Sequence, residues 1–432
     1  MKNTGVAIIG MGTVGTGVAR LLLDHGDRMT RHAGQSLTLK HAVVNNLAKQ
    51  REIDLEDNVL TDDVDRVIND DSVSVVCQLV GGIEPAREIM LKLLQNGKNV
   101  VTANKALLAE HGPELFEMAR SLGRSIAFEA SVCGGIPIIT AVSQCLSANQ
   151  IVSLRGIFNG TSNYIVSQMD QFGTDYETAV KEAQEFGFAE ADPTFDVDGS
   201  DAAQKLAILA HLAFGAKVPW KDIPKRGIES IDSLDFGFSK QMGYRIKLIA
   251  LANLGEAGLQ LSVGPMLTKI GSPLSEVRRN FNAVSVVGDA VGPVFLHGQG
   301  AGQMPTASAV VADLIDTAVG RTALTFQTLE LWSENSPTVN LDRPGNLQGK
   351  FYLRFNVDDD PGVLAQIAGV LGKHEISIAS VYQHESAETD ELGVPVVIMT
   401  QSAPENAASA AVTAISQAPF VRPNFERLRI LD

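Results

Sequence analysis

The residues best suited to chemistry lie between positions 185 and 205. A single lysine, Lys205, follows Asp201 by four positions, and six carboxylates precede it: Glu185, Glu190, Asp192, Asp196, Asp198 and Asp201. Because the run 202–210 is strongly helix-forming, Asp201 and Lys205 should lie on one helix face. Carboxylates beside one ammonium group suit the binding of a small cationic substrate and the movement of a proton. From spacing alone, a solvated acidic loop with one exposed ion pair is an equally good interpretation.

A glycine-rich turn near the amino terminus is typical of a dinucleotide-binding site. The apolar strand 6–9 runs directly into this turn, and an apolar helix follows over 18–23. Such a pattern combines a tight turn, close approach of a pyrophosphate and close packing of helix on strand. The pyrophosphate would lie at the helix N-terminus, where free N–H groups and the helix dipole favour an anion. We therefore expect a cofactor site, rather than a structural turn, at Gly10, Gly12, Thr13, Val14 and Gly15.

The residues after the second strand, 37–44, bear on the choice of cofactor. NAD-binding folds usually carry Asp or Glu there to bind the ribose 2′-hydroxyl. This chain has Asn45-Asn46 instead, followed by Lys49 and Arg51. No carboxylate would repel a 2′-phosphate, and two cations could attract one. The pattern favours NADP(H) and leaves NAD(H) open, while Lys49 and Arg51 could equally serve surface solubility alone.

Further strands should follow over 73–80 and 99–102. The first ends in Gly81-Gly82, which would let a cofactor ring or ribose approach the backbone, and the second leads to Lys105. Open α/β sheets bind ligands at the carboxyl ends of their strands, so Lys105 is a candidate second cation at the chemistry. Taken alone, it would be interpreted as a surface lysine. A strand over 125–129 then enters a glycine-rich turn that marks the exit from the cofactor domain.

Composition argues against several classes of protein. The chain has 432 residues and a formal net charge of −15, which opposes binding to nucleic acid or anionic membranes. No apolar run reaches transmembrane length. A strand begins almost at Met1, so we expect no signal peptide and a cytoplasmic location. The cysteines form neither a metal pair nor a disulfide framework and should be small core residues: Cys77, Cys133 and Cys145.

The pattern of elements predicts an α/β chain of three domains. We expect a Rossmann-type dinucleotide-binding domain over 1–135, with a helix over 306–319, in the segment 303–340, packing back onto it. The region 136–302 should form an α+β domain. A turn-rich linker over 341–349 separates the tail. In the tail, 350–432, the order strand-helix-strand-strand-helix-strand, with a polar turn between its second and third strands, is ferredoxin-like.

Together these motifs resemble the homoserine dehydrogenase family, in its single-function bacterial form with a regulatory tail. The resemblance covers nearly the whole chain. Its most specific element is the family signature, matched at Ala183, Gly187, Asp192-Pro193, Asp196-Val197, Gly199, Asp201 and Lys205. The strings 101–105 and 159–164 match as well, in the right order. The tail resembles an ACT domain at 360–364 and 376–381. The end of the second strand departs from family members that carry a basic residue directly at its tip.

The resemblance implies the reaction L-homoserine + NAD(P)+ ⇌ L-aspartate 4-semialdehyde + NAD(P)H, in the biosynthesis of threonine, methionine and isoleucine. Glu190 and Asp201 would hold the amino group or the hydroxyl, with Asp196 in support. Thr161 would contact the substrate carboxylate or the nicotinamide. Lys205 would be the general acid and Lys105 the second candidate, and the sequence leaves open which lysine donates. Residues outside the phosphate turn that we expect at the cofactor are Gly81, Lys105, Gly187 and Gly302.

The resemblance also implies a cation and partners. Family members hold a sodium ion largely through backbone oxygens, which suit a hard cation. The matching turn supplies Glu129, Val132, Gly134 and Ile136, although a purely structural turn is the alternative. ACT domains commonly bind amino acids, so threonine is the most plausible effector. The region 136–302 would be the catalytic and dimerisation domain, and pairing there and between ACT domains would give a homodimer or a homotetramer.

Two other functions fit parts of the pattern. A lyase could form a Schiff base at Lys205 or Lys105, but its nucleotide-binding fold would lack a purpose. A non-catalytic amino-acid sensor with a relict enzyme body would be expected to have lost its catalytic strings. The residues Gly10, Gly12, Lys105, Asp201 and Lys205 are all present, which disfavours the sensor.

Overall fold

The computed structural model describes residues 3–56, 58–334, 338–342, 344–383 and 393–431, and the chain divides into two compact units. The first unit comprises Met1–Leu154, Ala203–Ile223 and Phe281–Val339, and the second comprises Arg155–Ala202, Pro224–Asn280 and Asn340–Asp432. Part of the predicted linker, at Arg343, and the predicted polar turn of the tail, at 384–392, lie outside the described residues. Within the described ranges, no helix is long and apolar enough to cross a membrane.

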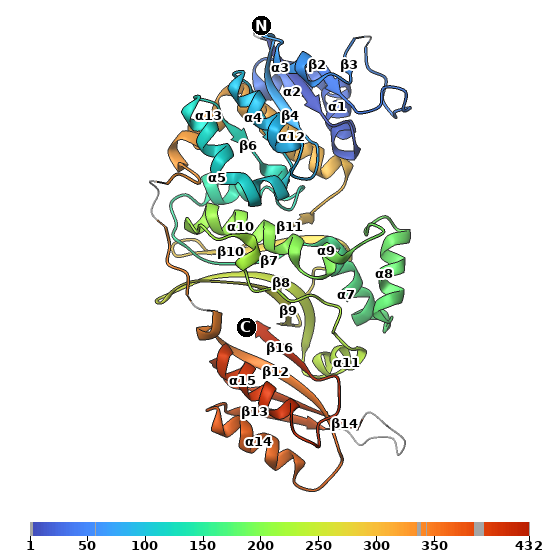
Figure 1. Cartoon of the computed structure of the whole chain (residues 1–432), viewed down its shortest axis with the longest axis vertical. Coiled ribbons are helices and arrows are strands. Elements are labelled where there is room, and N and C mark those ends of the chain that lie inside the picture. The colour runs from blue at the N-terminus through green and yellow to red at the C-terminus, as the bar shows by residue number, and fades with distance from the viewer. Residues whose placement is uncertain (1–2, 57, 335–337, 343, 384–392, 432) are drawn as a thin grey trace. The chain divides into compact units, whose positions relative to one another are not determined.

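A parallel sheet forms the centre of the first unit (Figure 1). Its strand order is β3 (Leu60–Thr61), β2 (Ser36–Val43), β1 (Asn3–Ile9), β4 (Val73–Gln78), β5 (Asn99–Thr102) and β6 (Ile126–Ala127). Every neighbouring pair in this order is parallel. The side chains of Val6, Ala7 and Ile8 are fully buried, as expected for strands covered on both faces. The sheet confirms the predicted Rossmann-type fold.

Helices of the first unit pack against this sheet and continue its core. They are α1 (Thr13–Asp24), α2 (Gly26–Ala33), α3 (Val64–Ile68), α4 (Ala86–Gln95), α5 (Lys105–Ser121), α12 (Gln303–Val319) and α13 (Arg321–Leu329). Residues Ala307, Val310 and Leu314 of α12 share one apolar cluster with Val6 and Val18. Helix α12 begins three residues before the predicted position 306. The segment 303–319 is thus distant in sequence from the cofactor strands but part of their core.

Two expectations about the first unit are wrong in detail. The predicted strand 125–129 shortens to β6, and Glu129–Ser131 forms a single 3-10 turn. The backbone N–H of Glu129 donates to Asp313 Oδ2 at 2.8 Å instead of to a strand. Cys145, expected in the core, is exposed at the end of a π-helical turn, whereas Cys77 and Cys133 are buried. The first difference reflects a contact with a residue 184 positions away in sequence.

The remaining strands of the first unit include an antiparallel hairpin that sequence patterns did not reveal. It consists of β10 (Phe281–Gly288) and β11 (Gly292–Gln299). The side chains of β11 alternate between half-buried and exposed, as in an antiparallel strand with one face towards solvent. Short helical turns at Ile138–Thr140 and Ala141–Cys145 follow the glycine-rich turn. Strand β7 (Ile151–Ile157) then leads out of this unit.

The second unit carries a sheet that runs from the middle of the chain into the tail. Its order is β8 (Tyr244–Gly255), β9 (Gly258–Lys269), β16 (Glu426–Leu431), β12 (Gln348–Val357), β14 (Val394–Thr400) and β13 (Ile378–Gln383). The pair β9–β16 is parallel, joining Arg429 to Met266 and Leu431 to Thr268, and the other neighbouring pairs are antiparallel. The tail therefore extends a hairpin of the middle region rather than forming a separate sheet.

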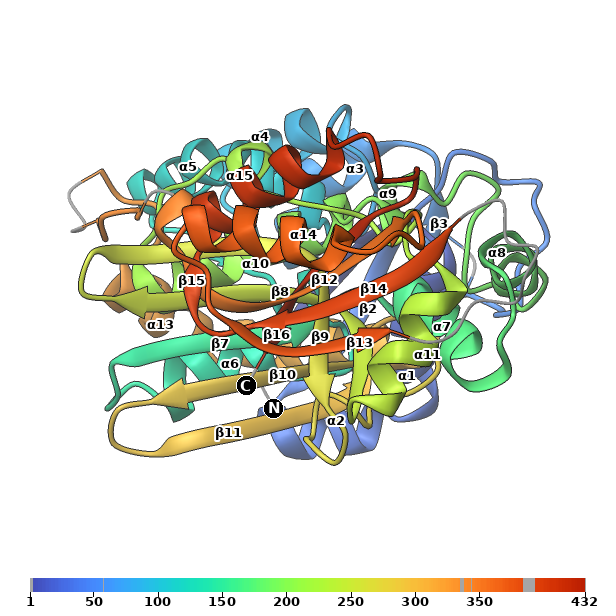
Figure 2. The ribbon, with the colours of Figure 1, turned by 90° about the horizontal axis from the view of Figure 1, so that it is seen from below.

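The tail has the predicted ferredoxin-like order. Helix α14 (Val363–Lys373) follows β12, and α15 (Glu405–Ser416) precedes β16. Figure 2 shows α14 and α15 side by side on one face of the β12–β14–β13 sheet. Their buried residues, among them Ile367, Ala408 and Val412, share a core with Phe351 and Ile398 of the strands. The prediction for this part of the chain is confirmed.

Five α-helices of the described residues lie between β7 and β8: α7 (Gly160–Phe172), α8 (Tyr176–Glu185), α9 (Thr194–Val197), α10 (Ser200–Phe214) and α11 (Ser233–Gln241). Helix α10 contains both Asp201 and Lys205, as predicted.

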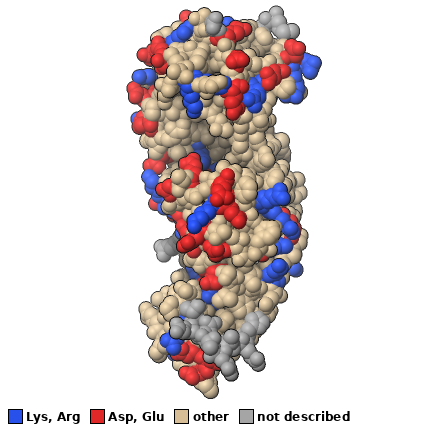
Figure 3. Space-filling model, turned by 90° about the vertical axis from the view of Figure 1, so that its right-hand side faces the viewer, with Lys and Arg blue, Asp and Glu red and all other residues tan. Residues whose placement is uncertain are grey.

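On the face drawn in Figure 3, acidic and basic side chains are interspersed rather than separated into large patches of one sign. That face shows no extended basic surface of the kind that binds nucleic acid.

Candidate functional site

The glycine-rich turn has the geometry that a pyrophosphate requires. Gly10 has φ +102° and lies at the end of β1, and α1 begins at Thr13 without a side chain capping its first turn. A Cβ on Gly15 would lie 2.1 Å from the carbonyl oxygen of Gly10, so only glycine allows this approach. The space around Gly12 is open. The first N–H groups of α1 therefore remain available to an anion.

A second segment of the first unit lies at the carboxyl ends of β4 and β5. Asn104 caps α5 through its Oδ1, and its side-chain amide donates to the carbonyls of Val80 and Gly82 at 3.0 and 2.6 Å. This holds the Gly81-Gly82 turn beside the first residue of α5, which is Lys105. Lys105 is half-buried. The predicted cofactor glycine Gly81 and the predicted second cation therefore come from adjoining segments of one sheet edge.

The cationic loop after β2 is shaped by its own arginine. The guanidinium of Arg51 donates to the backbone carbonyls of Lys49 and Asn46 at 2.7 and 2.6 Å. Lys49 is exposed. Two further predicted cofactor residues lie at helix ends, Gly302 directly before α12 and Gly187 just after α8, with φ of +121° and +70°. Arg51 thus organises the loop, and Lys49 presents its charge to solvent.

The acidic segment of the second unit is organised by Asn159. This residue caps α7 by accepting the N–H of Ser162 at 2.7 Å. Its side-chain amide donates to Asp196 Oδ1 at 2.7 Å and to Asp201 Oδ2 at 2.8 Å. Asp201 is only 2% exposed. One amide group therefore brings together two of the predicted substrate-binding carboxylates, which like-charge repulsion would otherwise keep apart.

Two other predicted substrate residues lie on the segments that flank this network. Thr161, at the start of α7, donates its hydroxyl to the carbonyl of Phe188 at 2.6 Å. Glu190 follows two residues later and is exposed, while its backbone carbonyl accepts from Gln184 at 3.2 Å. Thr161 therefore fixes the loop that carries Glu190. Among the described residues, the side-chain amide of Asn159 donates to Asp196 and Asp201, and not to the carboxylate of Glu190.

Asp198 connects the acidic segment to the helix that carries Lys205. Its carboxylate accepts from the backbone N–H and the hydroxyl of Ser200, both at 2.8 Å, at the start of α10. Asp201 lies in the first turn of this helix, and Lys205 one turn later with 9% exposure. The i,i+4 spacing places the carboxylate and the ammonium on the same face. A local helix start thus positions the predicted general acid relative to a predicted substrate ligand.

The predicted cation ligands lie around the turn that follows β6. Glu129 is buried, and its carboxylate accepts from the N–H groups of Ile139 and Thr140 and from the Thr140 hydroxyl at 2.6–2.8 Å. Burial raises the pKa of Glu129, while these hydrogen bonds act in the opposite direction. The carbonyl of Ile136 already accepts from Ile138. A carboxylate has about four acceptor positions, so Glu129 retains capacity for one further ligand.

Asn159 is a functional candidate that the sequence interpretation missed. It lies in the family-like string 159–164, and the sequence predicts no role for it. A local signal did exist, because Asn directly after an apolar strand and before a helix is a preferred N-cap. The N-cap role uses only its oxygen, however. The donation of its amide to Asp196 and Asp201, 37 and 42 positions later, has no local signal.

Comparisons with known proteins give one consistent result. The chain matches the models of the homoserine dehydrogenase NAD-binding domain over residues 10–129, homoserine dehydrogenase over 137–315 and the ACT domain over 351–418. It is 41% identical to homoserine dehydrogenase of Bacillus subtilis strain 168, over 92% of each chain.

Solved structures agree with this result. The structure of a homoserine dehydrogenase from Thiobacillus denitrificans has 38% identity and a TM-score of 0.92, covering 100% of this chain and 99% of that one. A hyperthermophilic archaeal homoserine dehydrogenase in complex with NADPH has 25% identity and a TM-score of 0.60, covering 73% and 97%. These matches cover the dinucleotide-binding domain, the acidic network and the tail. This chain therefore belongs to the homoserine dehydrogenase family of oxidoreductases and carries a C-terminal ACT domain.

Proposed function

We propose that this chain catalyses the NAD(P)-dependent interconversion of L-homoserine and L-aspartate 4-semialdehyde, running biosynthetically towards homoserine. The observation that carries the proposal is the arrangement around Asn159, which holds Asp196 and Asp201 together at the start of the helix that carries Lys205. Carboxylates that share a hydrogen-bond donor, here the buried Asp201 and the half-buried Asp196, suit the ammonium group of an amino-acid substrate. Membership of the family supports the same substrate.

The residues of this chain would orient the substrate and handle one proton, whereas the bound nicotinamide supplies or accepts the hydride. Asp201 and Glu190 would hold the substrate amino group or hydroxyl, and Asp196 would support Asp201. Thr161 would contact the substrate carboxylate or the cofactor through its backbone N–H, because its hydroxyl donates to Phe188. In the reducing direction, Lys205 would donate a proton to the oxygen of the developing alkoxide. Lys105 is the second candidate donor, or would polarise the same oxygen.

The cofactor is proposed to be NADP(H), with NAD(H) as a possible second substrate. The support is the loop after β2, which has no carboxylate at 44–49 to bind a ribose 2′-hydroxyl and presents Lys49 to solvent. The phosphate turn would hold the pyrophosphate through N–H groups at Gly12, Thr13 and Val14. Gly15 would contribute by letting α1 approach β1 closely.

A monovalent cation, sodium in this proposal, would be held by the carbonyls of Val132, Gly134 and Ile136 and by Glu129. The chemistry of this set fits a hard cation, since its donors are oxygens and since a cation would offset the cost of burying the Glu129 carboxylate. Its role would be structural, stabilising the turn between β6 and the helical turn at Ile138. Sodium-dependent protection of this turn from hydrogen exchange, absent with potassium or with Glu129→Gln, would support the assignment.

For regulation, we propose threonine as an inhibitory effector bound by the ACT domain, in a homodimer or homotetramer. The tail must act by binding the effector with different affinities in two arrangements of the protein. Because β16 pairs with β9, deletion of residues after Asn346 would leave β9 of the middle region without its neighbouring strand in the sheet. Retained turnover and lost threonine inhibition in that deletion would support the proposal. If turnover is lost, threonine titration of the intact chain by calorimetry decides instead.

The deciding experiment for the activity is the absorbance change of NADP+ and, separately, NAD+ when the protein is mixed with L-homoserine. Lys205→Ala should lower kcat by at least about 100-fold, within the range expected for removal of a general acid. Lys105→Ala measured in parallel shows which lysine donates, because only loss of the donor removes the corresponding limb of the kcat–pH profile. No turnover with either cofactor would contradict the proposal, and trapping of a covalent adduct with borohydride would favour a lyase.

A further inference from the structure

Two adjacent residues, Lys225 and Arg226, make ion pairs in opposite directions within the second unit. The ammonium of Lys225 lies 2.7 Å from Asp198 Oδ2 in the acidic segment. The guanidinium of Arg226 donates to Glu426 Oε2 and, at 2.7 Å, to the backbone carbonyl of Arg427 in β16. One dipeptide therefore contacts both the signature of the proposed active site and the last strand of the ACT domain.

On the side of the acidic segment, the contact is close and extends beyond the ion pair. Asp198 accepts from Lys225 and Ser200 together, so Lys225 contacts the carboxylate that also binds the first residue of α10. Gly199 has φ +86°, and a Cβ there would lie 3.2 Å from Val263 and 3.5 Å from the carbonyl oxygen of Arg226. The backbone N–H of Ile228 donates to the carbonyl of Val197 at 3.0 Å. The turn before Asp201 is thus packed directly on the segment 225–228.

On the side of the tail, the contact is buried at its carboxylate end. Glu426 is 1% exposed, and burial raises the pKa of its carboxyl, whereas Arg226 lowers it. The same strand, β16, pairs with β9, and Val263 of β9 accepts the backbone N–H of Arg226 at 2.9 Å. Arg226 is therefore held between β9 and β16. A displacement of β16 changes the position of Arg226 unless one of these hydrogen bonds breaks.

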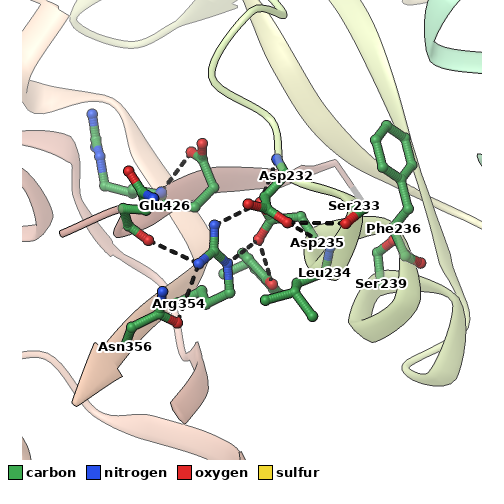
Figure 4. A network of polar contacts seen from close by, with 12 residues as sticks. Asp232, Ser233, Leu234, Asp235, Phe236, Ser239, Arg354, Asn356 and Glu426 are labelled. Carbon is green, nitrogen blue, oxygen red and sulfur yellow. Dashed lines mark hydrogen bonds and ion pairs between the residues drawn. The ribbon is translucent and has the colours of Figure 1, made fainter. Parts of the chain in front are cut away.

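A second contact anchors the tail to the same region. Figure 4 shows Arg354 of β12 facing Asp235 of α11, with Nε and Nη2 at 2.6 and 3.0 Å from its oxygens. Tyr352 donates its hydroxyl to the same carboxylate at 2.8 Å. Both partners of the ion pair are essentially inaccessible to solvent, at 1% and 0% exposure. The side chain of Arg226, by contrast, is 41% exposed. The Arg226–Glu426 pair is therefore more solvated, and more easily rearranged, than the Arg354–Asp235 pair.

We propose that Lys225 and Arg226 are positioning residues: they set the first turn of α10, with Asp201, and tie its placement to strand β16 of the ACT domain. The alternative is that both pairs are ordinary surface salt bridges, which contribute about 0–1 kcal/mol of stability and nothing to positioning. The kinetic part of the inference rests on the proposed function, whereas the structural part does not. Two experiments separate them.

The first experiment is hydrogen–deuterium exchange of the full chain without substrate, followed by mass spectrometry. Glu426→Gln keeps the shape of the buried side chain and removes the charge that Arg226 meets. It should speed the exchange of amides in 197–203 at least about threefold, because the helix start loses its support through Arg226. Arg422→Gln is the matched control, since it breaks the exposed Arg422–Asp358 pair elsewhere in the tail. Unchanged exchange at 197–203 in Glu426→Gln would overturn the link.

The second experiment is kinetic. Lys225→Met should lower kcat/KM for homoserine about tenfold, as small misplacement of catalytic groups does, and Lys225→Arg should restore it. Lys221→Met, which breaks the exposed Lys221–Glu110 pair, should leave kcat/KM unchanged. The Lys225→Met and Glu426→Gln effects should be non-additive by at least about threefold, whereas those of Lys225→Met and Arg422→Gln should be additive. A lowered melting temperature with wild-type kcat/KM in Lys225→Met would overturn the positioning role.

These outcomes also separate the inference from the proposed function. If the wild-type protein does not oxidise homoserine with either cofactor, the proposed function fails, and the exchange experiment still tests the link. If homoserine is oxidised but exchange at 197–203 does not respond to Glu426→Gln, the inference fails and the proposed function stands.

Discussion

The side-chain amide of Asn159 donates to Asp201 at 2.8 Å with one of its two hydrogens and to Asp196 at 2.7 Å with the other. Both donors of one amide are therefore committed to carboxylates, and its oxygen caps α7 through Ser162. Such a fully used amide orients Asp201 without adding charge. A positively charged substrate would then meet a carboxylate that is already ordered.

Asn159→Asp should abolish this arrangement. It replaces two N–H donors by a third carboxylate, so like-charge repulsion and lost hydrogen bonds act together. We expect kcat/KM for homoserine to fall about 100-fold, which corresponds to about 2.7 kcal/mol. Steady-state kinetics with saturating cofactor measures it. The control is Asn96→Asp, at the exposed C-terminal end of α4. An equal loss of kcat/KM in that variant would contradict the specific role of Asn159.

His211 should make the protein sensitive to acid. Its Nδ1 lies 3.0 Å from the carbonyl of Ala216, and its Nε2 accepts the N–H of Trp332 at 2.7 Å, so only the neutral ring satisfies both contacts. Burial lowers its pKa from 6.5 to about 4. Because the unfolded chain then binds the proton more readily, stability is lost as pH falls from 6.5 towards 4. Over this pH range, the free energy of unfolding should fall by about 3 kcal/mol because of His211 alone.

This acid effect is measured by urea unfolding at pH 7, 5.5 and 4. The comparison that isolates His211 is the difference between the wild type and His211→Gln at each pH, since other groups titrate in both proteins. His32→Gln, at an exposed ring, serves as the control. If the wild type and His211→Gln lose stability in parallel between pH 7 and 4, burial of a neutral His211 is not the cause.

The contribution of the Arg354–Asp235 ion pair to the free energy of unfolding can be measured with single and double variants. Arg354→Met leaves the carboxylate of Asp235 buried with Tyr352 as a remaining donor, at a cost of about 3–5 kcal/mol. Adding Asp235→Asn should recover much of that loss, because the neutral amide can still accept the N–H of Asp232 in the capping box of α11. Urea unfolding of the full chain measures both. Arg422→Gln, in an exposed pair, should cost less than about 1 kcal/mol.

Cofactor choice should depend on Lys49 more directly than on Arg51. Lys49 is exposed, whereas Arg51 donates to the loop backbone. Lys49→Ala should lower kcat/KM for NADP+ about tenfold and leave that for NAD+ unchanged, because only the 2′-phosphate carries the extra charge. Arg51→Ala should weaken both cofactors by disordering the loop. Lys92→Ala, whose ammonium pairs with Glu88 on α4, is the control. Equal losses for both cofactors in Lys49→Ala would refute the NADP interpretation.

Local patterns predicted much of this molecule correctly. The apolar strand 6–9, the glycine turn and the following helix are adjacent in sequence, so the turn at Gly10 and the start of α1 at Thr13 could be read without knowledge of the fold. The helix that carries Asp201 and Lys205 is equally local, because its residues favour that conformation whatever surrounds them. The tail was predictable because its strands and helices follow one another in the ferredoxin-like order, each marked by its own local pattern.

Other features could not be read in this way. The hairpin β10–β11 combines a mostly buried strand with one whose side chains alternate between half-buried and exposed, and the two strands become a hairpin only through their pairing. The strand expected at 125–129 ends early because Glu129 meets Asp313, 184 positions away, and Thr140. Each outcome depends on partners that propensity does not identify.

By itself, the sequence determined the local features of this protein: a glycine turn between a strand and a helix, a helix with a carboxylate and an ammonium one turn apart, and a ferredoxin-like tail. Only the tertiary structure decided that Asn159 joins Asp196 to Asp201, and that Lys225 and Arg226 connect Asp198 to β16. The physical reason is range, because helix and turn preferences act over a few residues, whereas side-chain hydrogen bonds form between whichever groups chain folding brings within about 3 Å.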